Sequence, residues 1–174
     1  MKNISFLVEG NDDARFIEKI IKPILLRKDK YFIKNIFQYS TLSPESRKKL
    51  INSIKELQQD YVCLHDFDLG PCITQKKERI KEQFKLNIDE ECLIIIKIEI
   101  ESWYLAGITQ RISTKLKIPY FPNTDNITKK RFIQITPTGK PKVVFMSELL
   151  NVYDSRVACQ QNSSFNYFFQ KYVN

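Results

Sequence analysis

The sequence predicts an α/β fold, in which a parallel sheet of about four strands is flanked by helices and followed by a helical C-terminal extension. Short runs of branched and aromatic residues alternate with amphipathic helical patterns in the first part of the chain. This alternation is typical of parallel strands joined by helices. With 174 residues, 43% of them hydrophobic, the chain is long enough to bury a core.

The first predicted strand covers residues 4–8, a compact apolar run that stops at Glu9-Gly10. Residues 11–13 (Asn, Asp, Asp) offer side chains that cap a helix and place negative charge at its N-terminus. Apolar residues then recur at helical spacing up to residue 25. Pro23 lies inside this pattern, where we expect a kink or the start of a new turn.

The same strand and helix unit then repeats. Further strands are predicted at residues 31–39, 61–64 and 92–100, and further helices after Ser43 and over residues 73–84. These elements predict a Rossmann-like core over residues 1–106.

The remaining residues, 107–174, lack the alternation of strand and helix. Pro-punctuated segments separate short helical patterns there, near residues 129–134, 143–152 and 165–173. We expect this part to be a basic segment and a helical extension that packs on the core, so that the chain forms a single domain overall.

The rare residue types exclude several kinds of site. The four glycines are never two residues apart, so the sequence has neither a GxGxxG motif nor a Walker A loop. The single His and the absence of CxxC argue against zinc sites, which leaves carboxylates as metal ligands. The sequence shows no targeting or membrane-spanning segment, so we expect a cytoplasmic protein with reduced cysteines and no membrane partner.

Acidic residues follow the predicted strands. Glu9 follows the first strand, Asp66 and Asp68 follow the third, and Glu99 and Glu101 lie at the end of the fourth. Parallel sheets bind ligands at the carboxyl ends of their strands. On an extended chain Asp66 and Asp68 would point the same way, and two adjacent carboxylates suit Mg²⁺ or Mn²⁺ with phosphate as a further ligand. The alternative is turn and capping chemistry alone, for these acids and for Asp12 and Asp13.

These motifs resemble those of the Toprim domain, which occurs in topoisomerases, bacterial primases, recombination mediators and OLD-family nucleases. The resemblance rests on Glu-Gly-x-x-Asp at residues 9–13 and Asp-x-Asp at residues 66–68. Residues 100–106 (Ile-Glu-Ser-Trp-Tyr-Leu-Ala) further resemble a stretch of small stand-alone OLD-like Toprim proteins. Residues 163–168 are similar to the C-terminal pattern of those proteins, with lower specificity.

The resemblance implies a nuclease that depends on Mg²⁺ or Mn²⁺. Glu9 would be a metal ligand or the general acid/base at the transferring phosphate, and Asp66 and Asp68 would hold Mg²⁺. Asp13 and Glu101 would complete the ligands for two metal ions. A lysine filling the space between Glu9 and the two aspartates would instead favour an inert scaffold.

OLD-like nucleases also use a late lysine to stabilise the charged transition state. Lys140 and Lys142 are the candidates for this role, although either is equally well explained as a solvated loop lysine. His65, beside Asp66, is a candidate proton shuttle, but we favour a packing or capping role. Because the Walker A loop is missing, any ATPase partner must come from another chain.

The net charge of +8 is concentrated in residues 107–147, which hold eight Lys and Arg against the single Asp125. We predict that this segment guides the phosphate backbone of DNA or RNA. The candidate nucleic-acid-binding residues are Lys129, Lys130, Arg131, Lys140 and Lys142. The aromatic residues that could stack on bases are Tyr120, Phe121 and Phe132.

Several functions stay open on the sequence alone. The first is a metal-dependent phosphodiester hydrolase, active by itself or as the effector of a larger complex. The second is a Toprim-like nucleic-acid-binding or regulatory subunit with weak catalysis. A phosphoacceptor receiver domain fits less well, because the fourth predicted strand ends in Lys97-Ile98-Glu99 without the expected Ser or Thr. A haloacid-dehalogenase-type phosphatase is disfavoured because Leu69-Gly70 follow the aspartates.

Overall fold

The computed structural model describes residues 1–68, 72–85 and 87–174. Leu69-Gly70, which bear on the phosphatase alternative, lie outside the described residues. The chain divides into two compact units, residues 1–95 and 96–174, and we describe each by itself. In the described ranges no helix combines the length and the apolar character that crossing a membrane requires.

The first unit is built on a four-stranded sheet in the order β2-β1-β3-β4, and the strands are parallel. The strands are β1 (Lys2–Val8), β2 (Tyr31–Gln38), β3 (Asp60–Asp66) and β4 (Leu93–Ile96). Strand β1 lies between β2 and β3, and its residues from Ile4 to Val8 are fully buried, as expected of a central strand. The predicted α/β fold with a helix-flanked parallel sheet is therefore confirmed.

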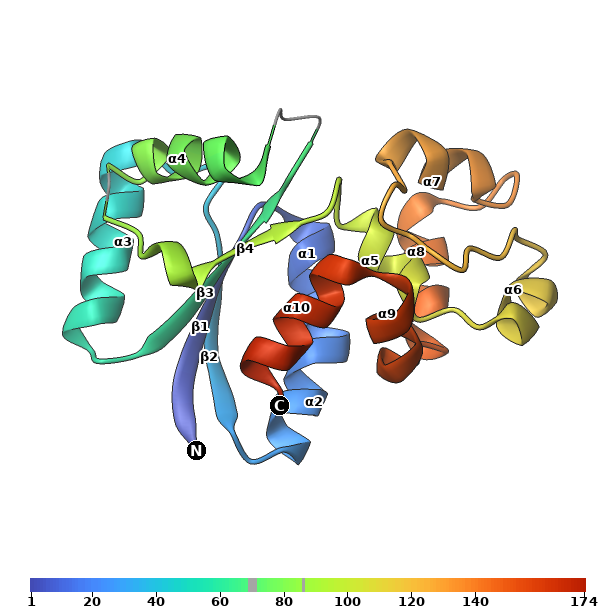
Figure 1. Ribbon diagram of the computed structural model, residues 1–174, viewed down its shortest axis with the longest axis horizontal. Helices are drawn as coiled ribbons and strands as arrows, with labels where there is room; N and C mark the ends of the chain where they lie inside the picture. The colour runs from blue at the N-terminus through green and yellow to red at the C-terminus, as the bar shows by residue number, and fades with distance from the viewer. Residues whose placement is uncertain (69–71, 86) are drawn as a thin grey trace. The chain divides into compact units, whose positions relative to one another are not determined.

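Helices lie on both sides of these strands, with α1 and α2 on one side and α3 and α4 on the other (Figure 1). The first two helices are α1 (Asn11–Phe16) and α2 (Lys22–Arg27), and a π-helical turn, η1 (Ile17–Ile21), joins them. Pro23 explains this turn: it has no N–H to donate to the carbonyl of Lys19, and its ring would press on that carbonyl in a regular helix. The expected irregularity at Pro23 is present as this wider turn.

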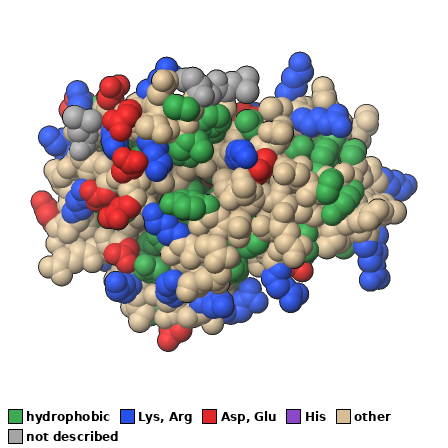
Figure 2. Space-filling model, in the orientation of Figure 1, with side chains coloured by type: hydrophobic (Ala, Val, Ile, Leu, Met, Phe, Trp, Pro, Cys, Tyr) green, Lys and Arg blue, Asp and Glu red, His purple; other side chains and the backbone are tan. Residues whose placement is uncertain are grey.

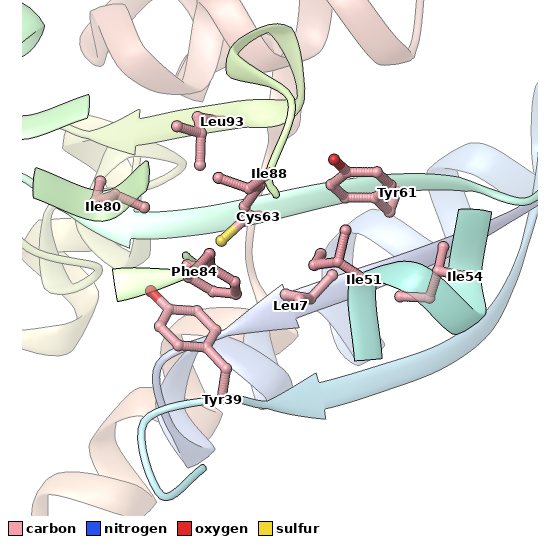
Figure 3. Close-up of a cluster of buried hydrophobic side chains, with 10 residues drawn as sticks. All are labelled: Leu7, Tyr39, Ile51, Ile54, Tyr61, Cys63, Ile80, Phe84, Ile88 and Leu93. Carbon is pink, nitrogen blue, oxygen red and sulfur yellow. The ribbon is translucent and has the colours of Figure 1, made fainter. Parts of the chain in front are cut away.

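The other side of the sheet carries α3 (Pro44–Glu56), α4 (Ile73–Gln83) and the short 3₁₀ turn η2 (Glu90–Cys92). Ser43 caps α3 by accepting a hydrogen bond from the Ser46 N–H. Apolar side chains from β1, β3, α3 and α4 meet in one buried cluster (Figure 3). The cluster consists of Leu7, Tyr39, Ile51, Ile54, Tyr61, Cys63, Ile80, Phe84, Ile88 and Leu93.

The fourth strand is shorter than the sequence predicts. We expected it over residues 92–100, but β4 ends at Ile96, so Glu99 and Glu101 do not end a strand. The Lys97 N–H donates to the hydroxyl of Ser164 (3.0 Å), and Ile98 has a left-handed backbone with φ of 64°. A strand cannot continue through such a turn, which depends on a partner 67 residues away in the chain.

The second unit is helical, as predicted for the C-terminal part. Its helices are α5 (Glu101–Ala106), α6 (Gln110–Leu116), α7 (Lys129–Ile135), α8 (Lys142–Asn151), α9 (Ser155–Gln161) and α10 (Ser163–Tyr172). The sequence indicated α7, α8 and α10 but not α6 or α9.

Trp103 is fully buried at the centre of the second unit. Its ring meets Phe165 edge-on at 5.2 Å between centroids and lies 5.7 Å from Phe168. This packing of α5 against α10 explains why the division of the chain falls after Ile95 and not after Ala106, where we had placed the end of the core. Gly107 follows α5 because the ring of Tyr153 lies where a β-carbon would be, 2.5 Å from that position.

Candidate functional site

The ends of β1 and β3 bring Glu9 and the chain around Asp66 together. One carboxylate oxygen of Glu9, Oε1, accepts a hydrogen bond from the Asp66 backbone N–H at 2.8 Å. The same oxygen lies 2.6 Å from Nδ1 of His65. The two strands are paired and parallel, so their carboxyl ends meet at one edge of the sheet.

Glu9 is held in its ionised form. Burial alone would raise its pKa, but the hydrogen bond and the charge of His65, together with the Asp66 N–H, hold the pKa of Glu9 below its usual value of 4.5. Nδ1 of His65 also faces the Asp66 carbonyl at 3.0 Å. Because both neighbours of Nδ1 are acceptors, Nδ1 carries a proton and donates it. His65 is buried and contacts the Glu9 carboxylate, so it holds the orientation of Glu9 in addition to packing.

Asp13 lies in the first turn of α1 and is buried. Its Oδ2 accepts a hydrogen bond from the Gly10 N–H at 3.0 Å, which is the capping role that the sequence left open. Its other oxygen, Oδ1, is buried and has no hydrogen-bond partner within the described part of the chain. Burial, with a smaller effect of the Glu9 and Asp12 charges, raises the pKa of Asp13 from 3.8 to about 7 despite the Gly10 N–H. A cation bound at Oδ1 would offset the free-energy cost of burying this carboxylate in its charged form.

Asp68 does not lie on the extended chain that we expected for an Asp-x-Asp pair. Its φ is 51°, in the left-handed region, so the chain is no longer extended there. The Asp68 side chain is exposed and pairs with Nζ of Lys76 in α4, at 2.7 Å from Oδ2. Asp66, by contrast, is the last residue of β3. The extended chain on which we based a shared direction of Asp66 and Asp68 therefore ends before Asp68.

The metal that the resemblance implies fits this edge only in part. Carboxylate oxygens are the right donors for Mg²⁺, and the buried Oδ1 of Asp13 is an acceptor that a cation would satisfy. Over residues 1–68, 72–85 and 87–174, however, no three His, Cys, Asp or Glu side chains converge as a metal site would require. Glu9 and Asp68 instead pair with His65 and Lys76, two cationic or hydrogen-bonding groups of the same unit.

In the second unit, two of the predicted site residues meet. Nζ of Lys142, the first residue of α8, lies 2.6 Å from Oε1 of Glu101, the first residue of α5. Glu101 is only 3% exposed. The other late lysine, Lys140, instead pairs with Glu148 at 2.6 Å, where both side chains are about a third exposed. The two candidate lysines, which the sequence could not distinguish, therefore have different partners: a buried acid for Lys142 and a partly exposed one for Lys140.

The segments at residues 100–106 and 163–168 contact each other. The hydroxyl of Ser164 accepts a hydrogen bond from Nε1 of Trp103 at 2.9 Å and donates one to Oδ1 of Asn162 at 2.7 Å. Asn162 also caps α10 through the Phe165 N–H and donates to the hydroxyls of Ser102 and Thr124. This buried network supports the start of α5, where Glu101 lies. Sequence reasoning missed Asn162, although an Asn before a helical run is a capping signal.

The three basic residues that begin α7 are exposed. Lys129, Lys130 and Arg131 form the first turn of α7, and the Lys129 N–H donates to the carboxylate of Glu99. Arg131 lies over the ring of Phe121 at 5.9 Å. The only acid of this segment, Asp125, is buried and pairs with Lys97 at 2.9 Å, so it does not offset the surface charge.

Figure 2 shows Lys and Arg side chains over the part of this unit where Figure 1 places α6 and α7. Of the three aromatic residues expected to stack on bases, Tyr120 and Phe121 are at least partly exposed. Phe132 is fully buried, 5.4 Å from the ring of Phe145, so its predicted stacking role is wrong. The helical spacing of α7 turns Phe132 inward while its neighbours face the solvent.

Comparison with protein-family models, with curated proteins and with solved structures finds no match to this chain.

Proposed function

We propose that this protein is a Mg²⁺- or Mn²⁺-dependent phosphodiester hydrolase that acts on DNA or RNA. The observation that carries the proposal is the buried oxygen Oδ1 of Asp13, which has no hydrogen-bond partner in the described ranges and belongs to the same edge as the ionised Glu9. A carboxyl in that setting is stabilised by a bound cation. The resemblance to the Toprim domain supports the proposal independently.

Asp13 would offer its unpartnered oxygen Oδ1 to the metal. Glu9 and Asp66 would hold the ion with it only if their carboxylates came together on binding, because no three such side chains converge in the described part of the chain, and Asp68 would join them only after leaving Lys76. A divalent ion bound there supplies a Lewis acid for phosphate and lowers the pKa of bound water. The chain's own residues prepare for this chemistry: His65 and the Asp66 N–H fix the orientation and charge of Glu9. A fixed, ionised Glu9 is suited to accept a proton from an attacking water.

The second unit, taken by itself, offers contacts suited to nucleic acid. The exposed cations of α7 offer phosphate contacts, and Tyr120 offers a face for a base. Of the two late lysines, Lys142 is the better candidate for a functional role, because it pairs with the buried Glu101, whereas Lys140 pairs with the partly exposed Glu148. We further propose a cytoplasmic location, in keeping with four free cysteines.

The proposal is tested by a cleavage assay on single- and double-stranded DNA and RNA with Mg²⁺ or Mn²⁺. Glu9→Gln keeps the shape of the side chain but removes its charge, and we expect it to reduce metal-dependent cleavage about 100-fold or more. Glu18→Gln is the matched control, because Glu18 is an exposed acid that pairs with Lys22 on the neighbouring helical turn. Equal cleavage by the wild type and Glu9→Gln would contradict the proposal.

A second candidate function is a nucleic-acid-binding or regulatory subunit with weak catalysis. The pairing of Asp68 with Lys76 favours it, since a lysine at this edge is what an inert scaffold would use to neutralise the acids. The same assay separates the two candidates. A protein that binds nucleic acid but does not cut it with any divalent ion would be the subunit, not the hydrolase.

A further inference from the structure

We propose that residues 118–122 (Ile-Pro-Tyr-Phe-Pro) form a platform on which a base of single-stranded nucleic acid stacks against Tyr120. The second unit would then prefer single strands to duplexes. The inference rests on the proposed function, because it takes nucleic acid as the ligand and adds which form of it is bound.

The first support is the way in which the ring of Tyr120 is held. Tyr120 is 38% exposed, but its hydroxyl reaches the side-chain amide of Gln161 at 3.1 Å, and Gln161 is only 5% exposed. In the amide orientation that gives each polar atom a partner, Gln161 accepts from this hydroxyl and donates to the carbonyls of Ala106 (3.1 Å) and Phe121 (2.9 Å). A buried amide thus fixes an exposed ring, which reduces the conformational entropy that is lost when a base stacks on it.

The second support is the anchoring of the chain around the ring. Residues 118–122 belong to no helix or strand of the described chain, but Pro119 and Pro122 fix φ on either side of the aromatic pair. Just beyond them, the N–H of the fully buried Thr124 donates to the backbone carbonyl of Gln161 at 2.8 Å. Gln161 therefore holds this segment through its backbone as well as through its side chain.

The third support is a cation placed beside the platform. The guanidinium group of Arg131 lies over the ring of Phe121, 5.9 Å from its centroid, so one face of that ring is already covered. Tyr120 is the more exposed of the two rings and offers its face to a base. Arg131, held against Phe121, is placed to contact a phosphate of the same strand.

The charge of the surrounding surface suits a phosphate backbone. Figure 2 shows hydrophobic side chains exposed among Lys and Arg where Figure 1 places α6 and α7. Exposed cations precede the platform along the chain and follow it: Arg111, Lys115, Lys117, Lys129, Lys130 and Arg131. Cations alone would attract a duplex as well as a single strand. The bases of a duplex are stacked on one another, so a single strand is the form that can offer a base to Tyr120.

The test is fluorescence anisotropy of the full-length, metal-free protein with probes of one sequence of about 20 nucleotides: single-stranded DNA, duplex DNA and single-stranded RNA. We expect Tyr120→Ala to bind the single strands about 5- to 150-fold more weakly, and the duplex as the wild type does. Tyr167→Ala is the matched control, because Tyr167 is also an exposed tyrosine of this unit and has Lys171 near its ring, at 5.7 Å. This control should change neither affinity.

Two further measurements distinguish stacking from a general change of the surface. Stacking releases no counterions, so Tyr120→Ala should keep the wild-type slope of log affinity against log salt, whereas Lys130→Gln should lower it by about 0.7. Tyr120→Phe keeps the ring and should keep the preference for single strands. Loss of that preference in Tyr120→Phe as well would trace the effect to the fold of the segment and overturn the stacking role.

The outcomes separate this inference from the proposed function. A preference for single strands that is lost in Tyr120→Ala but kept in Tyr167→Ala supports the inference, whether or not the protein cleaves. Equal affinity of the wild type for single strand and duplex, or unchanged binding by Tyr120→Ala, overturns the inference and leaves the hydrolase to the cleavage assay. Base faces and phosphates are common to DNA and RNA, so binding of only one of the two single strands would also overturn it. If the protein binds none of the probes at low salt, the inference and the nucleic-acid substrate of the proposed function are both overturned.

Discussion

The ammonium group of Lys142 lies 2.6 Å from Oε1 of Glu101, and the two residues are the first of α8 and α5. Glu101 is in the first turn of its helix, where a negative charge is favourable, but it is also buried, where a charge needs a partner. Lys142 provides that partner. The pair therefore joins two helices of the second unit, and replacing either residue alone should lower the free energy of unfolding.

We expect Lys142→Met to destabilise the protein by about 3 kcal/mol, because it leaves the buried carboxylate of Glu101 unpaired. Lys140→Met is the control and should change the free energy of unfolding by about 1 kcal/mol or less, since Lys140 belongs to a partly exposed pair with Glu148. Urea denaturation measures both. In the double variant Glu101→Gln with Lys142→Met the loss should be smaller than the sum, and simple additivity would show that the two residues do not interact.

The raised pKa of Asp13 predicts how stability depends on pH. The carboxyl titrates at 3.8 when the chain is unfolded and at about 7 when it is folded. Its contribution to stability is therefore complete below about pH 4 and is lost as the pH rises through about 7. Asp13→Asn, which does not titrate, should become more stable relative to the wild type over this range, by about 4 kcal/mol at most. Thermal unfolding of both proteins at a series of pH values measures the difference.

Mg²⁺ provides a second readout at Asp13. If Asp13 binds the metal, Mg²⁺ should recover part of the stability that the wild type loses above about pH 7, because the cation favours the ionised carboxylate. Asp13→Asn should gain less from Mg²⁺ than the wild type. The same gain in both proteins would show that Mg²⁺ acts elsewhere.

The three cations of α7 should show opposite effects on stability and on binding. Lys129, Lys130 and Arg131 lie in the first turn, where positive charge opposes the helix dipole. Their replacement by Glu should raise the stability of the protein slightly, but weaken the binding of DNA and lower the salt dependence of that binding by about 2 to 3 in log–log slope. Fluorescence anisotropy at several salt concentrations measures the slope. An unchanged slope would refute the assignment of these residues to phosphate contacts.

The buried network around Asn162 should be sensitive to its central side chain. Asn162→Ala removes the cap of α10 and leaves the hydroxyls of Ser102 and Thr124 each short of a partner, so we expect a loss of about 2 to 3 kcal/mol. Asn166→Ala is the control, because Asn166 lies inside α10, where Ala is the better helix former. Chemical denaturation that finds equal stability for the two variants would contradict this role of Asn162.

Periodicity predicted much of the fold because it reports on local properties. The central strand could be identified as a continuous apolar run, and the helix after Ser43 from its cap and its apolar stripe. The predicted end of the fourth strand was wrong, because a residue far along the chain determines where the strand ends. The turn at Lys97 depends on Ser164, and no pattern within residues 92–100 shows that the strand stops at Ile96.

The candidate site divides in the same way. The pattern of strands and helices was enough to bring Glu9 and Asp66 to one edge, because the carboxyl ends of adjacent parallel strands lie together. The packing of the folded chain selects the partner of each acid: the imidazole of His65 for Glu9, Lys76 for Asp68 and Lys142 for Glu101. Coulomb energy depends on the separation and the burial of two charges, and both are set by how the helices pack, which their positions along the chain do not reveal.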